Sequence, residues 1–252
     1  MVDKTTKPEL RAAVDKYLDL CIADFYANIP FATHQLEAKE INLEYYKRHN
    51  IETILRLRRK RTIDALALQY FTKVDPVAAK KWAHYTDDEM LHDKLFAADL
   101  AKVGVEKASI YATEPLLSTK LLTGYLQYGI EFEGTPLALI TSVYFVEYTT
   151  TRTQPKWLDN LEESLGRDKI KGQRAHVGTD LDDHHDDFVW GVLETLVPDA
   201  AAEDRVMLHL QEICRLWQMY FLELHQLTVD PLTQIALPAP LPVPVPELQQ
   251  VS

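Results

Sequence analysis

The segment from residue 175 to residue 196 places histidines and aspartates at helical spacing. On one helix, His176, Asp180 and His184 are each four residues apart, and Asp183 is seven residues from the first of them, so the four side chains share one stripe. Neutral imidazole and carboxylate groups are ordinary ligands for iron, zinc and manganese. A calcium-binding EF-hand loop is excluded because its glycine is missing. The stripe therefore predicts half of a metal site, and a solvated acidic helix face is the alternative.

Three neighbouring side chains, Asp182, His185 and Asp186, fall on other faces of the same expected helix. About 100° around the helix separates His185 from His184. We expect these three side chains to be solvated and the loss of His185 to have little effect.

A metal site needs ligands from further helices, and two segments can supply them. Glu89 and His92 form an ExxH pair, whose i, i+3 spacing is the unit that di-iron carboxylate bundles use. Glu147 lies in an almost wholly apolar run. A buried carboxylate is costly there unless it is paired, protonated or bound to metal. An ion pair with Arg152 or with a lysine is the alternative for Glu147.

A further carboxylate is expected before the turn at Asp75-Pro76. If the helices on either side of this turn are antiparallel, the partner of Glu89, fourteen residues after Asp75, should lie a similar distance before it. Asp64 is eleven residues before the turn, whereas Glu52 is twenty-three before it and roughly 20 Å further along the helix. Simple geometry favours Asp64, and a longer connection would favour Glu52. For either residue the alternative is a solvated carboxylate beside the basic run RLRRKR, residues 56–61, which is expected to be solvated or to face the substrate.

The elements that must position these residues are expected to be helices. Only 8 of the 252 residues are glycine and 46% are hydrophobic, which favours long helices around a sizeable core. Apolar residues recur every three or four positions, and Pro76 stands at a natural first helical position. Pro155 is expected to break a helix. The seven expected helical ranges are 8–29, 43–73, 76–102, 116–132, 136–151, 157–197 and 201–228.

The end of the chain differs in composition from the rest. Alternating prolines in ALPAPLPVPVPELQQVS forbid helix and sheet and favour polyproline II. We expect a single helical domain over residues 1–230 and a proline-rich tail over residues 231–252.

The net charge and the cysteine content limit which classes of partner and which cellular location are expected. The formal charge of −11 argues against a nucleic-acid partner, because phosphate binding needs a basic surface. No run of about 18 apolar residues exists, so no membrane partner is expected. The two cysteines, Cys21 and Cys214, are far apart and form no CxxC motif. They suit free thiols in a reduced cytoplasm better than a disulfide scaffold, so a cytoplasmic location is expected.

An ExxH pair, an isolated glutamate in an apolar helix and an HxxxD pair follow one another in that order. In this pattern the chain resembles the haem-oxygenase-like di-iron oxidases over about residues 50–200, and especially the members that form 1-alkenes from fatty acids. The resemblance implies an all-α, haem-oxygenase-like bundle that binds two Fe(II) ions per chain and uses dioxygen as co-substrate. The iron ligands that it implies are Glu89, His92, Glu147, His176 and Asp180.

Two ligand positions stay open within this resemblance. The family's early carboxylate stands well upstream of ExxH, which matches Glu52 better than Asp64, against the simple geometry. Many members have a histidine three residues after the aspartate of HxxxD, where this chain has Asp183 followed by His184. A ferritin-type site is less favoured, because it would show two ExxH pairs and this chain has one.

The resemblance also implies the reaction class. Family members abstract hydrogen, oxygenate nitrogen or cleave C–C and C–N bonds, so the expected substrate is a small carboxylic acid or amino acid, including fatty acids. Tyr144 and Tyr148 are expected to wall the substrate pocket, and plain core packing is the alternative. Arg152 is expected to clamp a carboxylate, and exposure at the surface is the alternative. A homodimer is a possible assembly. Two other functions stay open: a thiaminase-like hydrolase, which needs a nucleophilic cysteine beside a carboxylate, and a non-enzymatic helical binding protein.

Overall fold

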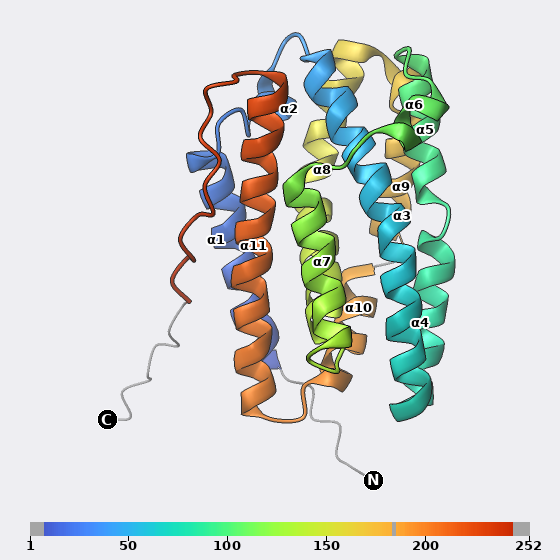
Figure 1. Cartoon of the computed structure of the whole chain (residues 1–252), viewed down its shortest axis with the longest axis vertical. Helices are drawn as coiled ribbons and strands as arrows, with labels where there is room; N and C mark the ends of the chain where they lie inside the picture. Colours follow the sequence, from blue (N-terminus) through green and yellow to red (C-terminus); the bar gives the residue numbers. More distant parts are fainter. Residues whose placement is uncertain (1–7, 183–184, 244–252) are drawn as a thin grey trace.

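The protein is a bundle of helices that run mostly along its longest axis (Figure 1). This computed structural model describes residues 8–182 and 185–243, without the side chains of residues 179–182. The described ranges contain no strand. Their α-helices are α1 (Pro8–Asn28), α2 (His34–Glu37), α3 (Leu43–Val74), α4 (Pro76–Glu89), α5 (His92–Lys102), α6 (Lys107–Ala112), α7 (Leu117–Glu131), α8 (Leu137–Leu165), α9 (Lys171–Asp182), α10 (His185–Leu193) and α11 (Ala200–Thr228). Two short 3-10 helices, η1 (Arg167–Lys169) and η2 (Glu194–Leu196), complete them.

The predicted all-α class is confirmed, whereas the predicted number of about seven helices is too small. The expected range 76–102 is two helices, α4 and α5, because the chain turns at Met90 and Leu91. The expected range 157–197 is also divided: α8 ends at Leu165, and α9 and α10 follow as separate helices. The short helices α2 and α6 lie in segments for which no helix was expected.

Helices α3 and α4 meet at Asp75, as the sequence predicted, and they pack against each other as a hairpin. The Asp75 side chain accepts hydrogen bonds from the backbone N–H groups of Val77 and Ala78 at 2.9 and 3.1 Å, which caps α4. Pro76 occupies the first turn of α4, where its missing N–H costs nothing. The indole N–H of Trp82 on α4 donates to the backbone oxygen of Asp64 on α3 at 3.0 Å. The hairpin therefore fixes Asp64 close to the middle of α4.

The expected break at Pro155 is wrong, because α8 continues through this residue. A proline inside a helix removes one backbone hydrogen bond and costs about 3 kcal/mol. The residues that follow it in α8 include Trp157, Leu158 and Leu161, all buried in the core. Burial of these large side chains offsets the cost, at roughly 1.5–3 kcal/mol each.

Helix α8 is the central element of the bundle. It packs against α7, α9, α10 and α11, and α3 packs against α4, α5, α7 and α11 (Figure 1). Between Leu137 and Tyr148, α8 is buried at almost every position. A helix that is apolar all round must lie inside the protein. Glu147, near the end of this stretch, is therefore brought into the interior.

Cys21 on α1 and Cys214 on α11 are joined by a disulfide, which corrects the expectation of two free thiols. The two residues are 193 positions apart in the chain, but α1 and α11 lie side by side (Figure 1). Sequence separation gave no indication of this contact, since it depends on the packing of the first and last long helices.

Residues 231–243 form neither helix nor strand, in agreement with the proline-rich composition. This part of the chain runs back along α11 (Figure 1), where the Arg215 side chain donates a hydrogen bond to the backbone oxygen of Pro238. Among the described helices, none combines the length and the apolar character that a membrane crossing requires.

Candidate metal centre

One group of potential metal ligands joins α4, α5 and α9. It consists of Glu89, His92 and His176, whose ligand atoms lie within 4.8 Å of one another. The rings of the two histidines are 4.4 Å apart between centroids, and Phe96 packs on His176 at 5.4 Å. Glu89 ends α4 and His92 begins α5, so the ExxH pair spans a turn between two helices instead of lying on one helix face. The structure thus brings together three side chains that the sequence singled out.

A second group joins α4, α8 and α10. It consists of Glu89, Glu147 and His185, again with ligand atoms within 4.8 Å of one another, and all three residues are buried. Nδ1 of His185 lies 3.8 Å from Oε2 of Glu147. The hydroxyl of Tyr85 donates to Oε1 of Glu147 at 2.6 Å. Glu89 belongs to both groups, so the two candidate sites share one carboxylate.

The expectation that His185 is solvated is wrong. Only 4% of this residue is exposed, and its ring packs on Tyr85 with 5.7 Å between centroids. The expectation assumed one continuous helix, but α9 ends at Asp182 and α10 begins at His185. The orientation of the His185 side chain therefore cannot be deduced from helical periodicity that starts at His176. The signal that sequence reasoning missed is the strongly apolar sequence after His185, which begins a buried helix.

Three predicted ligands fall where the structure gives no side-chain position. Asp183 and His184 lie outside the described residues, and Asp180 lies in α9 where only the backbone is described. Their predicted role as ligands stays a prediction.

The two candidates for the early carboxylate have different surroundings. Glu52 is fully buried, and its oxygens bind Arg48 at 2.6 Å, the hydroxyl of Thr119 at 2.6 Å and the backbone N–H of Leu116 at 3.2 Å. It belongs to neither ligand group. These contacts connect α3 to α7, so in the structure Glu52 stabilises the packing of these two helices.

Asp64 lies next to Glu89, as the geometry of the hairpin predicted. The two residues line a small cavity of about 10 Å³. One Asp64 oxygen accepts a hydrogen bond from Lys60 at 2.8 Å, and the other, Oδ1, is buried with no hydrogen-bond partner. Burial raises the pKa of Asp64, the ammonium of Lys60 opposes this effect, and the nearby Glu89 raises the pKa further. Lys60, a member of the basic run RLRRKR, is thus a cation beside the candidate centre.

Charges around Glu89 favour its ionised form. Burial alone would raise its pKa, but His92, Lys60 and His176 outweigh burial and lower it. The pKa of the neighbouring Tyr85 is raised well above its ordinary value by burial and by the charge of Glu147, so this phenol keeps its proton. The centre therefore combines the ionised carboxylate of Glu89 with the protonated phenol of Tyr85, which acts only as a hydrogen-bond donor.

Buried atoms at the centre have unused capacity to bind a cation. Oε1 of Glu89 and Nδ1 of His92 lie 3.0 Å apart as a close pair, and neither atom has a further hydrogen-bond partner. Buried polar atoms without a partner are rare in folded proteins and call for an explanation such as an ion. Imidazole nitrogen and carboxylate oxygen are the donor types that iron, zinc and manganese accept. The residues present therefore fit a metal centre.

A cavity of about 260 Å³ adjoins both ligand groups. Glu89, Glu147, His176 and Tyr85 line one part of it, and the Cys21–Cys214 disulfide lines another. Most of the remaining wall is apolar and includes Ile22, Phe25, Leu57, Phe145, Trp217 and Phe221. Such a cavity suits a small, largely apolar molecule.

The residues expected to bind substrate lie elsewhere. Tyr144 and Tyr148 are buried, but their hydroxyls donate to Asp15 at 2.5 Å and Asp19 at 2.9 Å on α1. Arg152 is exposed, and its guanidinium lies over the Tyr148 ring. None of these three predicted residues is among those that line the cavity. The aromatic periodicity of α8 reflects its packing against α1, which the sequence alone did not distinguish from a pocket wall.

Comparison with known proteins supports the fold and gives no activity. No family model and no curated protein matches the chain. A solved structure from Shewanella denitrificans OS217, described as a domain of unknown function with a haem-oxygenase-like fold, aligns with a TM-score of 0.73 and 18% identity. The alignment covers 93% of this chain and 100% of that chain. The chain therefore has a haem-oxygenase-like fold.

Proposed function

We propose that the protein is a non-haem di-iron oxidase or oxygenase that uses dioxygen to oxidise a small carboxylic acid or amino acid. The observation that carries this proposal is that Glu89 belongs to two overlapping groups of potential ligands. A carboxylate has two oxygens and can bind two ions, and di-metal sites hold their ions about 3.5–4 Å apart. A shared glutamate flanked by His92 and His176 on one side, and by Glu147 and His185 on the other, suits such a pair.

The residues around this centre have separate roles in the proposal. Two Fe(II) ions held by these ligands would supply the electrons that reduce dioxygen. Tyr85 holds one Glu147 oxygen through its hydrogen bond, which leaves the other oxygen directed towards His185 and Glu89. The apolar cavity wall excludes water from the reacting atoms and receives the apolar part of the substrate.

The disulfide weighs against the thiaminase-like alternative. That hydrolase needs a nucleophilic thiolate, but both cysteines of the chain are joined to each other. A binding protein without catalytic activity would bind metal or ligand but consume no dioxygen.

Anaerobic titration with Fe(II) tests the proposal. We expect the wild-type protein to bind two ions per chain and Glu89→Gln to bind fewer than one, because both groups lose the shared ionised carboxylate. Glu163→Gln is the matched control, since this glutamate is exposed on α8. The iron-loaded wild type should then consume dioxygen faster when a suitable carboxylic acid is added. A protein that binds no iron, or equal iron binding by the wild type and Glu89→Gln, would refute the di-iron proposal. Iron binding without dioxygen consumption across a panel of acids would favour the binding protein.

A further inference from the structure

One cation in the cavity wall lacks an acidic partner. Arg56 on α3 lines the cavity, and no carboxylate of the described residues lies within 4.0 Å of its guanidinium. Two other arginines of α3, Arg48 and Arg61, bind the carboxylates of Glu52 and Asp93. The remaining two, Arg58 and Arg59, are exposed to solvent and do not line the cavity. A half-buried positive charge without a counter-charge is unfavourable unless something else compensates it.

The surroundings of Arg56 leave donors unused. Its guanidinium lies over the rings of Trp217 and Tyr220, 4.7 and 4.4 Å from their centroids, and Nη2 donates to the hydroxyl of Thr53 at 3.0 Å. Nη1 is buried and has no hydrogen-bond partner. The indole nitrogen of Trp217, which also lines the cavity, is buried without a partner as well. These are two unused N–H donors on side chains in contact, one of them charged, and a charged donor binds an anion more strongly than a neutral one does.

The nearby histidine does not add a second positive charge. His49 lines the same part of the cavity, and its Nδ1 lies 3.0 Å from the hydroxyl of Tyr220. Desolvation, assisted by the charge of Arg56, lowers the pKa of His49 to about 3. His49 is therefore neutral at physiological pH, and Arg56 carries the charge at this end of the cavity.

The anion site and the candidate metal centre are separated along α3. Lys60 binds Asp64, and Asp64 lies beside Glu89, which places the metal centre near the level of residues 60–64. Arg56 is four residues from Lys60 and eight from Asp64, or about 6–12 Å along a helix axis. The two parts of the cavity are thus chemically different, and Leu57, Lys60 and Ile63 line the cavity between them along α3.

We propose that Arg56, assisted by Trp217, binds the carboxylate of an amphipathic substrate and directs its apolar body towards the metal centre. The binding step stands on the cavity alone, whereas its consequence for catalysis rests on the proposed function. In this orientation the carbon that reaches the metal centre is remote from the carboxylate. Arg56 is then a positioning residue that determines which carbon is oxidised.

The same cavity disfavours an amino acid bound in this orientation. An α-ammonium group next to the carboxylate would need an acidic partner near Arg56. Among the residues whose side chains the structure describes, the acidic ones that line the cavity are Glu89 and Glu147, and both belong to the candidate metal centre. An aliphatic acid with a single charged end fits the cavity better.

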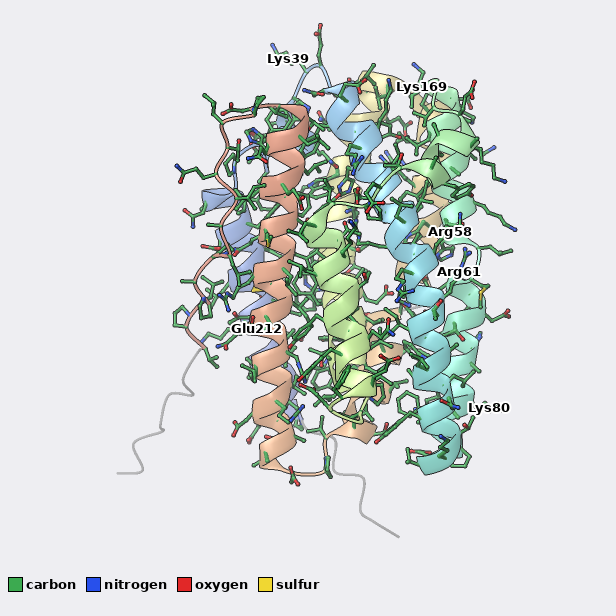
Figure 2. All side chains as sticks on the ribbon, viewed as in Figure 1. Lys39, Arg58, Arg61, Lys80, Lys169 and Glu212 are labelled. Atoms are coloured by element: carbon green, nitrogen blue, oxygen red, sulfur yellow. A yellow bond between two sulfur atoms is a disulfide. The ribbon has the colours of Figure 1, made fainter. Side chains whose placement is uncertain are left out.

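The test uses metal-free full-length protein and measures binding of octanoate and octan-1-ol by the change in tryptophan fluorescence and by calorimetry. The affinities for the two ligands are compared within each variant. General damage to the cavity would weaken both ligands alike and leave their ratio unchanged. We expect the wild type to prefer octanoate and Arg56→Gln to lose this preference by about 10- to 100-fold, the range for a hydrogen-bonded charge. Arg56→Lys should retain part of it. The matched control is Arg58→Gln, because Arg58 lies on the same helix but is exposed and should leave the ratio unchanged (Figure 2).

Several results would overturn the inference. One is an octanoate-to-octanol affinity ratio in Arg56→Gln that equals the wild-type ratio. Another is wild-type protein that binds octylamine as tightly as octanoate, and this measurement needs no variant. Octanoate binding that appears only after iron is added would mean that the carboxylate binds the metal, which would refute this orientation and leave the di-iron proposal intact. Conversely, a protein that binds octanoate through Arg56 but takes up no iron would keep the anion site and refute the di-iron proposal.

Discussion

Glu89 is the residue on which the candidate centre depends. It is 9% exposed, and an isolated ionised carboxylate at such a position would be unstable. His92, His176 and Lys60 surround it with imidazoles and one ammonium, which lowers its pKa despite burial. The same surroundings leave one of its oxygens without a hydrogen bond. Glu89 thus has a stabilised negative charge and an oxygen that is available to a cation. A carboxylate that binds two ions needs both properties.

The histidines of the two groups should be separable by mutation. We expect His176→Ala and His185→Ala each to reduce the iron content of the protein from two ions to about one, because each variant removes the imidazole of a different group. The matched control is His84→Ala, whose side chain is 69% exposed on α4 and which should keep both ions. Metal analysis after anaerobic loading gives the stoichiometry. If His185→Ala retained two ions while His176→Ala did not, α10 would contribute no ligand.

At the scale of elements, two connections hold the walls of the cavity. The hairpin of α3 and α4 places Arg56, Lys60 and Asp64 along one side and Glu89 at the end of the second helix. The Cys21–Cys214 disulfide joins α1 to α11 on the cavity wall. A cross-link between residues 193 positions apart restricts the unfolded chain strongly.

Reduction of this disulfide should lower stability. We expect the Cys21→Ala/Cys214→Ala double variant, or the reduced wild type, to lose about 2–4 kcal/mol of unfolding free energy. Urea unfolding with and without reductant measures this loss. The reductant should affect the wild type and leave the double variant unchanged. Equal sensitivity of both proteins, or no change in either, would show that the cross-link does not form or does not stabilise the fold.

At the scale of the whole molecule, the sequence predicted the helical class and the boundary between α3 and α4 because these depend on local signals. Apolar periodicity defines α3, and Asp75 and Pro76 mark its end. The turn at Met90 and Leu91 has no glycine or proline to mark it, so the ExxH pair looked like one helix face. The α8 helix continues through Pro155 because tertiary packing outweighs a local preference.

The candidate site was predictable in part for the same reason. Glu89, His92, Glu147 and His176 stood out by residue type and spacing, and the structure brings them together. His185 was expected to be solvated, and Arg56 and Lys60 stood out only as members of the basic run RLRRKR, because their individual positions depend on how α10 and α3 pack against other helices. Tyr144 and Tyr148 had the residue types of a pocket wall, but their hydroxyls bind Asp15 and Asp19 on α1, and only the three-dimensional arrangement shows this.

The most direct test of the shared-carboxylate centre is anomalous X-ray diffraction at the iron edge from crystals loaded anaerobically with Fe(II). We expect two anomalous peaks about 3.5–4 Å apart, each within bonding distance of a different oxygen of Glu89. One peak should lie beside His92 and His176, and the other beside Glu147 and His185. A single peak, or two peaks of which only one contacts Glu89, would contradict the account.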